Sequence, residues 1–260
     1  PSWLVRAPRQ ISRQLAEARR NPRALVGGGF VKEPAGSTEH YARWANEMSE
    51  RELWLQQFRE VTLILPTWFM ARAAFEAAGR FPEASPEAEG EAEDLFFFHA
   101  HIDAFLAAAR AQAGEGGAGR AAEPAGHGCL VRVGDAASPV LRYRYLESSG
   151  SWRTPRRKLL SIRARAFERR VLGAGGEWAR FTVWGAGRDG RQFIGELSPA
   201  ARARIRAICD VDPKKIGSEY YNHRLKDGPP CRLPIIHFSA PPHPAPRPPR
   251  RRPPAPLPAR

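Results

Sequence analysis

The chain has 260 residues, enough for one large domain or two small ones with a real hydrophobic core. It has no run of eighteen apolar residues, which excludes a membrane-spanning helix, and its three isolated cysteines (Cys129, Cys209, Cys231) argue for a reducing, cytoplasmic location without disulfides or zinc. The net charge of +14 is uneven: residues 151–260 hold 24 basic and 8 acidic side chains, which favours a polyanionic partner for this part.

Helical and strand patterns alternate over the first sixty residues. Ser12–Arg20 has the spacing of an amphipathic helix, which Asn21-Pro22 should end. Leu25–Val31 is typical of a strand interrupted by three glycines, and Ser49–Phe58 of a second helix.

The stretch from Val61 to Phe98 carries the most chemistry. In order, the pattern predicts a buried strand (Val61–Leu65), a Thr-Trp-Phe turn, a short helix (Ala71–Ala78) closed by Gly79, and the pair Glu93-Asp94 before the apolar run Leu95–Phe98. An Asp before an apolar helical run is typical of a helix N-cap. A carboxylate beside apolar surface also holds a proton more tightly and can act as a general base, and the two roles are compatible.

This ordered set resembles the acceptor half of the family-2 inverting glycosyltransferases, and most of all the queuosine-tRNA galactosyltransferases among them. The resemblance extends to three further segments, Ser37–Trp44, Leu141–Tyr145 and Phe181–Phe238. It implies a GT-A-type domain that transfers galactose from UDP-galactose to queuosine in tRNA, with inversion and a divalent metal (Mn²⁺ or Mg²⁺). By position, Asp94 would be the catalytic base with Glu93 beside it, and Trp68 and Arg144 would shape the acceptor side.

Two donor-side features of the family are missing. Its acidic metal- and diphosphate-binding motif precedes the first helix, where residues 1–10 offer no such pair. Asp210-Val211-Asp212 has the spacing but lies in another domain, and the family's His-containing segment after Tyr145 is absent. We therefore expect a C-terminal portion without its donor half, inactive by itself, with no metal site of its own.

The middle of the chain predicts a helix (Ala100–Ala111) and two strands (Cys129–Val133 and Pro139–Tyr145), with Gly/Ala/Glu-rich loops at Ala84–Gly90 and Gly114–Gly128. His99 and His101 are two residues apart on a helix, so their rings should point apart and hold no metal.

A strongly basic helix is predicted for Arg153–Arg170, which contains eight basic residues and one acid. We expect it to contact tRNA phosphates, through the side chains Arg153, Arg156, Arg157, Lys158 and Arg163. The alternative is a solvated linker helix.

A second domain begins with the strand Phe181–Trp184 and the motif GxGxxG, formed by Gly185, Gly187 and Gly190. Helices at Arg191–Leu197 and Pro199–Ile205 should follow, then a strand, Arg206–Asp210, that ends in an acid twenty residues after the motif. This order is typical of dinucleotide binding, with the acid on a ribose hydroxyl. The unit is short, so a scaffold or ligand-sensing module is the preferred interpretation over an NAD site.

Together these patterns predict an α/β protein: residues 1–150 form the acceptor half of a GT-A-like domain, 151–175 a basic linker helix, 176–238 a small Rossmann-like module and 239–260 a disordered Pro/Arg-rich tail. Two other functions stay open, a non-catalytic RNA-binding protein and an NAD-dependent oxidoreductase that uses the GxGxxG unit.

Overall fold

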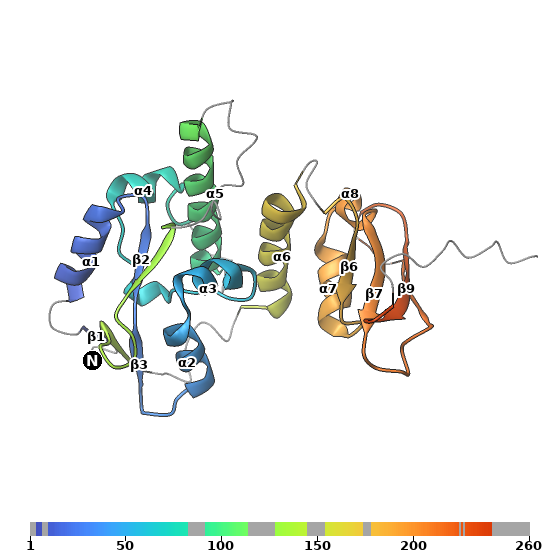
Figure 1. Cartoon of the computed structure of the whole chain (residues 1–260), viewed down its shortest axis with the longest axis horizontal. Helices are drawn as coiled ribbons and strands as arrows, with labels where there is room; N and C mark the ends of the chain where they lie inside the picture. The colour runs from blue at the N-terminus through green and yellow to red at the C-terminus, as the bar shows by residue number, and fades with distance from the viewer. Residues whose placement is uncertain are drawn as a thin grey trace, which may run out of the picture. The chain divides into compact units, whose positions relative to one another are not determined.

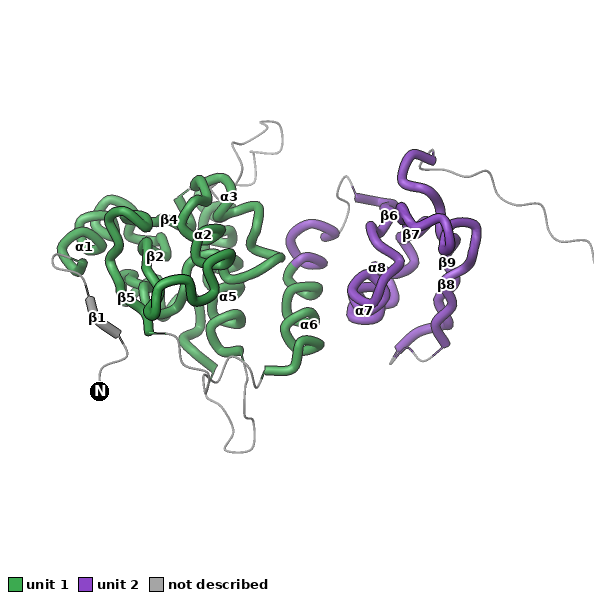
Figure 2. The backbone as a smooth tube through the Cα atoms, turned by 90° about the horizontal axis from the view of Figure 1, so that it is seen from below, with its two compact units in different colours: residues 1–166 green, residues 167–260 purple. Residues whose placement is uncertain are grey.

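The computed structural model describes residues 4–6, 10–82, 92–113, 128–144, 154–173, 178–223, 225 and 227–240. It is a mixed α/β structure with small parallel sheets, in two compact units: unit 1, residues 1–166, and unit 2, residues 167–260 (Figure 2). None of the helices in the described ranges has the length and apolarity needed to cross a membrane. Several predicted features lie outside the described residues: the loop Ala84–Gly90, residues 114–127 of the second loop, Arg153 and the tail from residue 241.

Unit 1 begins with an α/β segment (Figure 1). Its elements in chain order are β1 (Leu4–Arg6), α1 (Gln10–Arg20), β2 (Leu25–Gly28), β3 (Phe30–Glu33), α2 (Glu39–Glu47), α3 (Glu50–Leu55), the 3-10 turns η1 (Gln56–Phe58) and η2 (Leu65–Thr67), α4 (Arg72–Ala77), α5 (Glu93–Ala113), β4 (Leu130–Val133), β5 (Leu141–Arg144) and α6 (Arg156–Phe167). The predicted helix at Ser12–Arg20, the short helix before Gly79 and the two later strands are confirmed. The boundary between the units falls inside α6, after Ala166.

Two small sheets order these elements. β3 and β5 are parallel, with β1 antiparallel on the other edge of β5, and β2 pairs in parallel with β4. The predicted glycine break separates β2 from β3. At Gly29 a Cβ would lie 2.4 Å from the backbone of Asp135, so the chain can pass there only without a side chain.

The predicted strand Val61–Leu65 is wrong. These residues form a buried loop that leads into η2, in which Thr62 donates its hydroxyl hydrogen to the Leu53 carbonyl at 3.1 Å. Leu63 packs over Gly27, where a Cβ would be 2.7 Å from its side chain. An apolar run indicates burial, and here the buried side chains cover β2 instead of pairing with a strand. The pairing occurs later, where Phe69 and Val26 exchange backbone hydrogen bonds of 2.8 and 2.9 Å.

The core of unit 1 is built around α5. The Glu93–Phe98 run and the predicted helix Ala100–Ala111 form this one helix of 21 residues. Its Leu95, Phe98 and Ile102 are almost completely buried, together with Phe30 of β3 and Leu25 of β2. This packing fixes the first turn of α5, which contains Glu93 and Asp94.

Unit 2 is built on a four-stranded sheet. After the π-helical segment η4 (Glu168–Leu172) come β6 (Phe181–Trp184), α7 (Arg188–Glu196), α8 (Pro199–Arg202), β7 (Ile205–Asp210), β8 (Glu219–Asn222) and β9 (Cys231–His237). The strand order is β6-β7-β9-β8, with β6, β7 and β9 parallel and β8 antiparallel to β9.

Three sequence predictions for unit 2 need correction. The basic helix ends at Phe167 as an α-helix and continues as η4 to Leu172. The helix predicted from Arg191 begins at Arg188, inside the glycine motif, and the one predicted to Ile205 ends at Arg202 because Ile205 starts β7. Strand β8 was not predicted, because its four residues are short and mixed in polarity.

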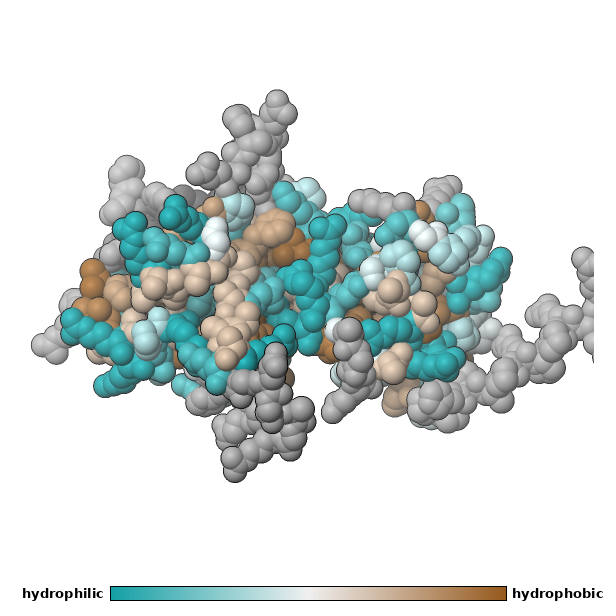
Figure 3. Space-filling view, turned by 90° about the horizontal axis from the view of Figure 1, so that it is seen from above, coloured by the Kyte–Doolittle hydropathy of each residue, from teal (hydrophilic) through white to brown (hydrophobic). Residues whose placement is uncertain are grey.

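The face of the molecule seen in Figure 3 is mixed in character, and hydrophobic and hydrophilic residues interrupt one another over both units there. The exposed large hydrophobic side chains among the described residues include Ile11 and Leu55 in unit 1 and Trp184 and Phe238 in unit 2.

Candidate functional site

Asp94 lies in the first turn of α5, half-buried between the apolar core and solvent. Its Oδ1 accepts the backbone N–H of Leu95 at 2.7 Å, which orients the carboxylate, and no described side chain donates to the other oxygen. Burial raises the pKa of Asp94 above its ordinary value, and the negative charges of Glu93 and Glu60 add to this rise. The carboxylate therefore holds a proton more tightly than an exposed Asp, as we expected for an acid beside phenylalanines.

Four other side chains, from distant parts of the chain, belong to the same electrostatic cluster. Arg163 of α6 donates to Glu60 at 2.6 Å. Burial raises the pKa of Tyr41, and the charges of Glu60 and Asp94 and the hydroxyl of Tyr143 raise it further. The tertiary structure thus brings α2, the loop after η1, β5, α5 and α6 to one place.

Aromatic rings and cations surround this cluster. Tyr41 and Trp44 are 5.7 Å apart between ring centroids, and the guanidinium carbon of Arg59 is 5.1 Å from the centre of the Trp44 ring. The Lys32 ammonium is 4.1 Å from the centre of the Tyr143 ring, and burial lowers the pKa of Lys32. Carboxylates, tyrosine hydroxyls and ring faces together can bind a polar ring compound by hydrogen bonds and stacking.

Trp68 is occupied by packing. Its indole Nε1 donates to the Leu63 carbonyl at 2.6 Å. Its ring contacts Phe81, Phe97 and Phe98 at centroid distances of 6.2, 5.7 and 6.4 Å. Phe98 lies one helical turn after Asp94 on the same side of α5, so Trp68 supports the turn that carries the carboxylate. These contacts give Trp68 a packing role at this turn, and its acceptor-binding role stays a prediction.

The structure places Tyr143 and Arg144 on opposite faces of β5. Tyr143 is half-buried and faces Tyr41, whereas Arg144 is exposed like Arg142. Tyr143 thus lies beside Tyr41 in the cluster, and the acceptor-side role of Arg144 stays a prediction.

The predicted tRNA-binding residues divide into two groups. Arg156 and Arg157 are exposed at the start of α6, and Lys158 is half-exposed. Arg163 has a side chain only 16% exposed and is paired with Glu60, so it belongs to the cluster around Asp94. Arg153 lies outside the described residues.

His99 and His101 are both buried in α5 and point into different surroundings. His99 stacks on Phe58 at 6.2 Å, and His101 lies 6.5 Å from Phe97 and pairs with the backbone of Cys129. Burial lowers the pKa of His101 to about 4, so it is neutral at pH 7. Within the described ranges no three His, Cys, Asp or Glu side chains gather as a metal site.

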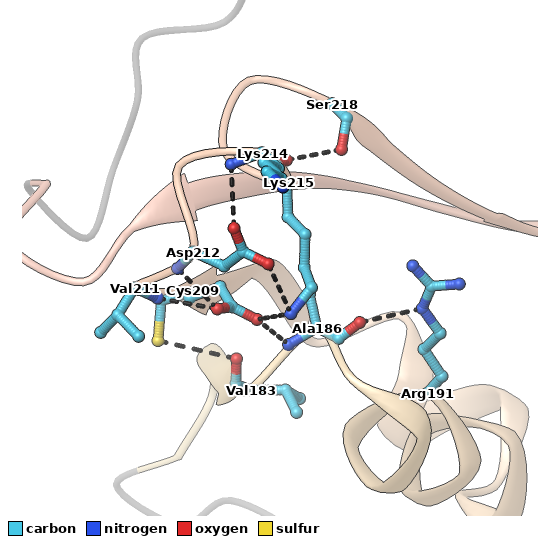
Figure 4. Close-up of polar contacts among 10 residues, drawn as sticks. Val183, Ala186, Arg191, Cys209, Val211, Asp212, Lys214, Lys215 and Ser218 are labelled. Carbon is cyan, nitrogen blue, oxygen red and sulfur yellow. Dashed lines mark hydrogen bonds and ion pairs between the residues drawn. The ribbon is translucent and has the colours of Figure 1, made fainter.

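In unit 2 the loop of the glycine motif contacts the turn after β7, where Ala186, Asp212 and Lys215 come together in Figure 4 and Ala186 donates its backbone N–H to Asp210. The Asp210 carboxylate accepts the backbone N–H of Asp212 at 2.9 Å and of Ala186 at 2.7 Å, and the Lys215 ammonium lies 3.3 Å away. These donors lower the pKa of Asp210 to about 2, with the Asp212 N–H making the largest contribution. The acid that sequence reasoning placed on a ribose therefore holds the turn of its own loop.

The glycines of this loop have different roles. Gly185 has φ +91°, a left-handed conformation that favours glycine. A Cβ on Gly190 would lie 1.9 Å from the Gly185 carbonyl oxygen, so this glycine is needed for packing, whereas Gly187 has open space beside it. β6 pairs only with β7 among the described strands, so this loop does not lie where strand order reverses, the usual place of a bound dinucleotide. These contacts favour a scaffold over an NAD site.

Sequence reasoning missed Glu60 and Tyr143. Arg and Tyr alternate from Arg142 to Tyr145, which puts the two tyrosines on one face of a strand, and this alternation is the sequence signal that could have pointed to Tyr143. Nothing in the sequence pointed to Glu60, since its partner Arg163 is 103 residues away. No protein-family model matches the chain, and no solved structure matches it.

Proposed function

We propose that unit 1 is the acceptor side of an inverting glycosyltransferase of GT-A type. Following the sequence resemblance, the transferred sugar is galactose from UDP-galactose and the acceptor is queuosine in tRNA. The observation that carries the proposal is the Asp94 carboxylate: it is half-buried, oriented by the Leu95 N–H, and raised in proton affinity by its surroundings. A general base needs this combination of fixed direction and raised pKa.

In the proposed reaction Asp94 accepts the proton of the acceptor hydroxyl as that oxygen attacks the anomeric carbon of the donor sugar. The bond from the anomeric carbon to the diphosphate breaks, UDP leaves with the electron pair, and the configuration inverts. Glu60 and Glu93 keep the negative potential high at Asp94, which favours proton uptake. Tyr41, Trp44 and Tyr143 supply the rings and hydroxyls that would hold the acceptor.

A divalent metal is implied for the family, where it holds the donor diphosphate. The described residues do not fit such an ion, because no three metal-binding side chains come together there. No step is therefore derived through a metal, and the donor side would be supplied by residues other than those described.

The partner proposed for α6 is the tRNA backbone. Arg156 and Arg157 are exposed at the first turn of this helix, and Lys158 follows them. Contacts with phosphates would make the affinity fall steeply with salt. Unit 2 is proposed as a small Rossmann-like scaffold, with Gly185, Gly187, Gly190 and Asp210 forming a structural turn.

The test is Asp94→Asn in a polypeptide that carries this chain together with a nucleotide-binding donor half. We expect galactose transfer to queuosine-containing tRNA to fall by about 10²–10⁴-fold, the usual contribution of a general base, while tRNA binding is unchanged. Asp103→Asn on the same helix is the control and should leave transfer intact. Retained transfer in Asp94→Asn would refute the base assignment.

We expect the 260-residue chain by itself to transfer no galactose, because its described residues contain no group of three metal-binding side chains. Turnover of UDP-galactose by this chain would refute this expectation, while the Asp94→Asn variant would still test the role of Asp94.

A further inference from the structure

Among the described residues of unit 2, helices lie on one side of the sheet only. α7 and α8 gather on the same side of the strands (Figures 1 and 2). Phe181 and Val183 of β6 are buried, as are Ile194 and Leu197 at the helix side, whereas Trp184 is 64% exposed. Predominantly parallel sheets are usually covered on both faces, and no described helix covers the second face here. This face is therefore a candidate interaction surface.

The strand register shows which side chains share the uncovered face. Trp184 lies opposite Cys209 and Cys209 opposite Ile236, so these three point to one side. Arg232 is four residues before Ile236 on the same strand, and Tyr221 lies opposite Arg232. Trp184 and Tyr221 thus stand on the same face, roughly 20 Å apart by strand spacing and rise.

The exposed side chains of this surface are mainly aromatic. The rings of Trp184 and Phe238 meet edge to face at 5.8 Å, and both are more than half exposed. Tyr221 is 46% exposed and has the Arg232 guanidinium 4.1 Å from its ring centre, and Arg232 also pairs with the Glu219 carboxylate at 2.8 Å. Of the exposed large hydrophobic residues described in unit 2, Val211 is the aliphatic exception. Exposed ring faces can stack on flat ligands and can also pack in a protein interface, so the charge of the unit decides between these occupants.

The charge of unit 2 favours a polyanion. Its residues 167–260 include 18 basic and 8 acidic side chains. Residues 241–260, which follow shortly after Phe238, include five arginines and no acid. Ring faces for stacking combined with an excess of arginine are the features by which proteins bind unpaired nucleic acid.

We propose that the sheet face of unit 2 that no described helix covers binds unpaired RNA, with bases stacked on Trp184 and Tyr221 and phosphates attracted by the net positive charge of the unit. Recognition of single-stranded RNA by aromatic side chains on an open four-stranded sheet is a known physical solution. The proposal does not rest on glycosyl transfer, because it uses none of the residues around Asp94.

The experiment measures fluorescence anisotropy of a labelled single-stranded oligoadenylate of about twelve nucleotides, within the size range of such sites, titrated with the full chain. We expect Trp184→Ala and Tyr221→Ala each to weaken binding by about fivefold or more, the effect of losing one stacked base. Trp184→Phe should keep most of the affinity, and duplex RNA of the same length should bind more weakly than the single strand.

Trp178→Ala is the matched control. Trp178 is also an exposed tryptophan of unit 2, 47% accessible, but it precedes β6 at the opposite end of that strand. The Trp178→Ala variant should bind the single strand as tightly as the wild type, and circular dichroism should show that all variants are folded. The proposal is overturned if the chain does not bind the single strand, if Trp178→Ala and Trp184→Ala weaken binding equally, or if Trp184→Ala instead abolishes self-association of the chain.

Discussion

Gly190→Ala tests the structural role of the glycine loop in unit 2. The added Cβ would lie 1.9 Å from the Gly185 carbonyl oxygen, and contacts under 3.0 Å essentially never occur, so the loop or α7 must move by about 1 Å. The clashing atom is backbone and Gly185 is held at φ +91°, so no side-chain rotation relieves it. Overpacking costs about 1–3 kcal/mol, and we expect the upper end of this range for unit 2.

The matched control is Gly195→Ala in the same helix. Nothing lies within 4 Å of the added Cβ at this position, and its backbone is helical. Alanine should therefore stabilise unit 2 by about 0.5 kcal/mol, through its better helix propensity.

Hydrogen exchange followed by mass spectrometry is the appropriate assay, since two units need not unfold together and a single melting temperature would mix them. Gly190→Ala should lower protection in peptides from β6, α7 and β7 and leave α5 of unit 1 unchanged. If Gly190→Ala protects these peptides as well as the wild type does, the glycine is not needed for packing, and the dinucleotide interpretation of the motif is open again.

The remaining predictions concern charged side chains. Because the folded-state pKa of Asp94 is raised, its contribution to stability is present at low pH and lost as pH rises. Asp94→Asn should therefore raise the free energy of unfolding of unit 1 near neutral pH. This gain in stability over the wild type should disappear on acidification, as measured by urea unfolding. The pKa of Asp210 is lowered from 3.8 to about 2, so wild-type unit 2 should lose stability as pH falls through this interval. At pH values above this interval Asp210→Asn should be less stable than the wild type. Its unfolding, followed by circular dichroism, should not change with pH across the interval. Arg163→Ala should destabilise unit 1 by about 1 kcal/mol in urea unfolding, through loss of the Glu60 pair, and unchanged stability would contradict this role. Arg156→Ala should lower the affinity for tRNA and reduce its salt slope, and an unchanged slope would contradict the phosphate contact.

Local sequence signals predicted most elements of this chain. The helix at Ser12–Arg20, the glycine break after β2 and the strand Phe181–Trp184 follow from side-chain periodicity and backbone freedom, which depend on near neighbours only. The proximity of Asp94 to apolar rings was also predictable, because the Phe residues follow it directly on one helix. The strand prediction for Val61–Leu65 was wrong because an apolar run indicates burial and does not show whether the backbone has a partner strand.

Pairing across long sequence separations was decided only by the tertiary structure. The sequence by itself determined that Asp94 lies in the first turn of a helix, that Asp210 ends a strand and that the basic charge gathers after residue 150. Only the fold brought Glu60 to Arg163 and Tyr143 to Tyr41, supplied backbone N–H donors to the Asp210 carboxylate and left one face of the unit 2 sheet without a described helix. The reason is physical: a carboxylate's partners and a strand's second face are set by what packs against them, and those groups come from segments that local patterns do not connect.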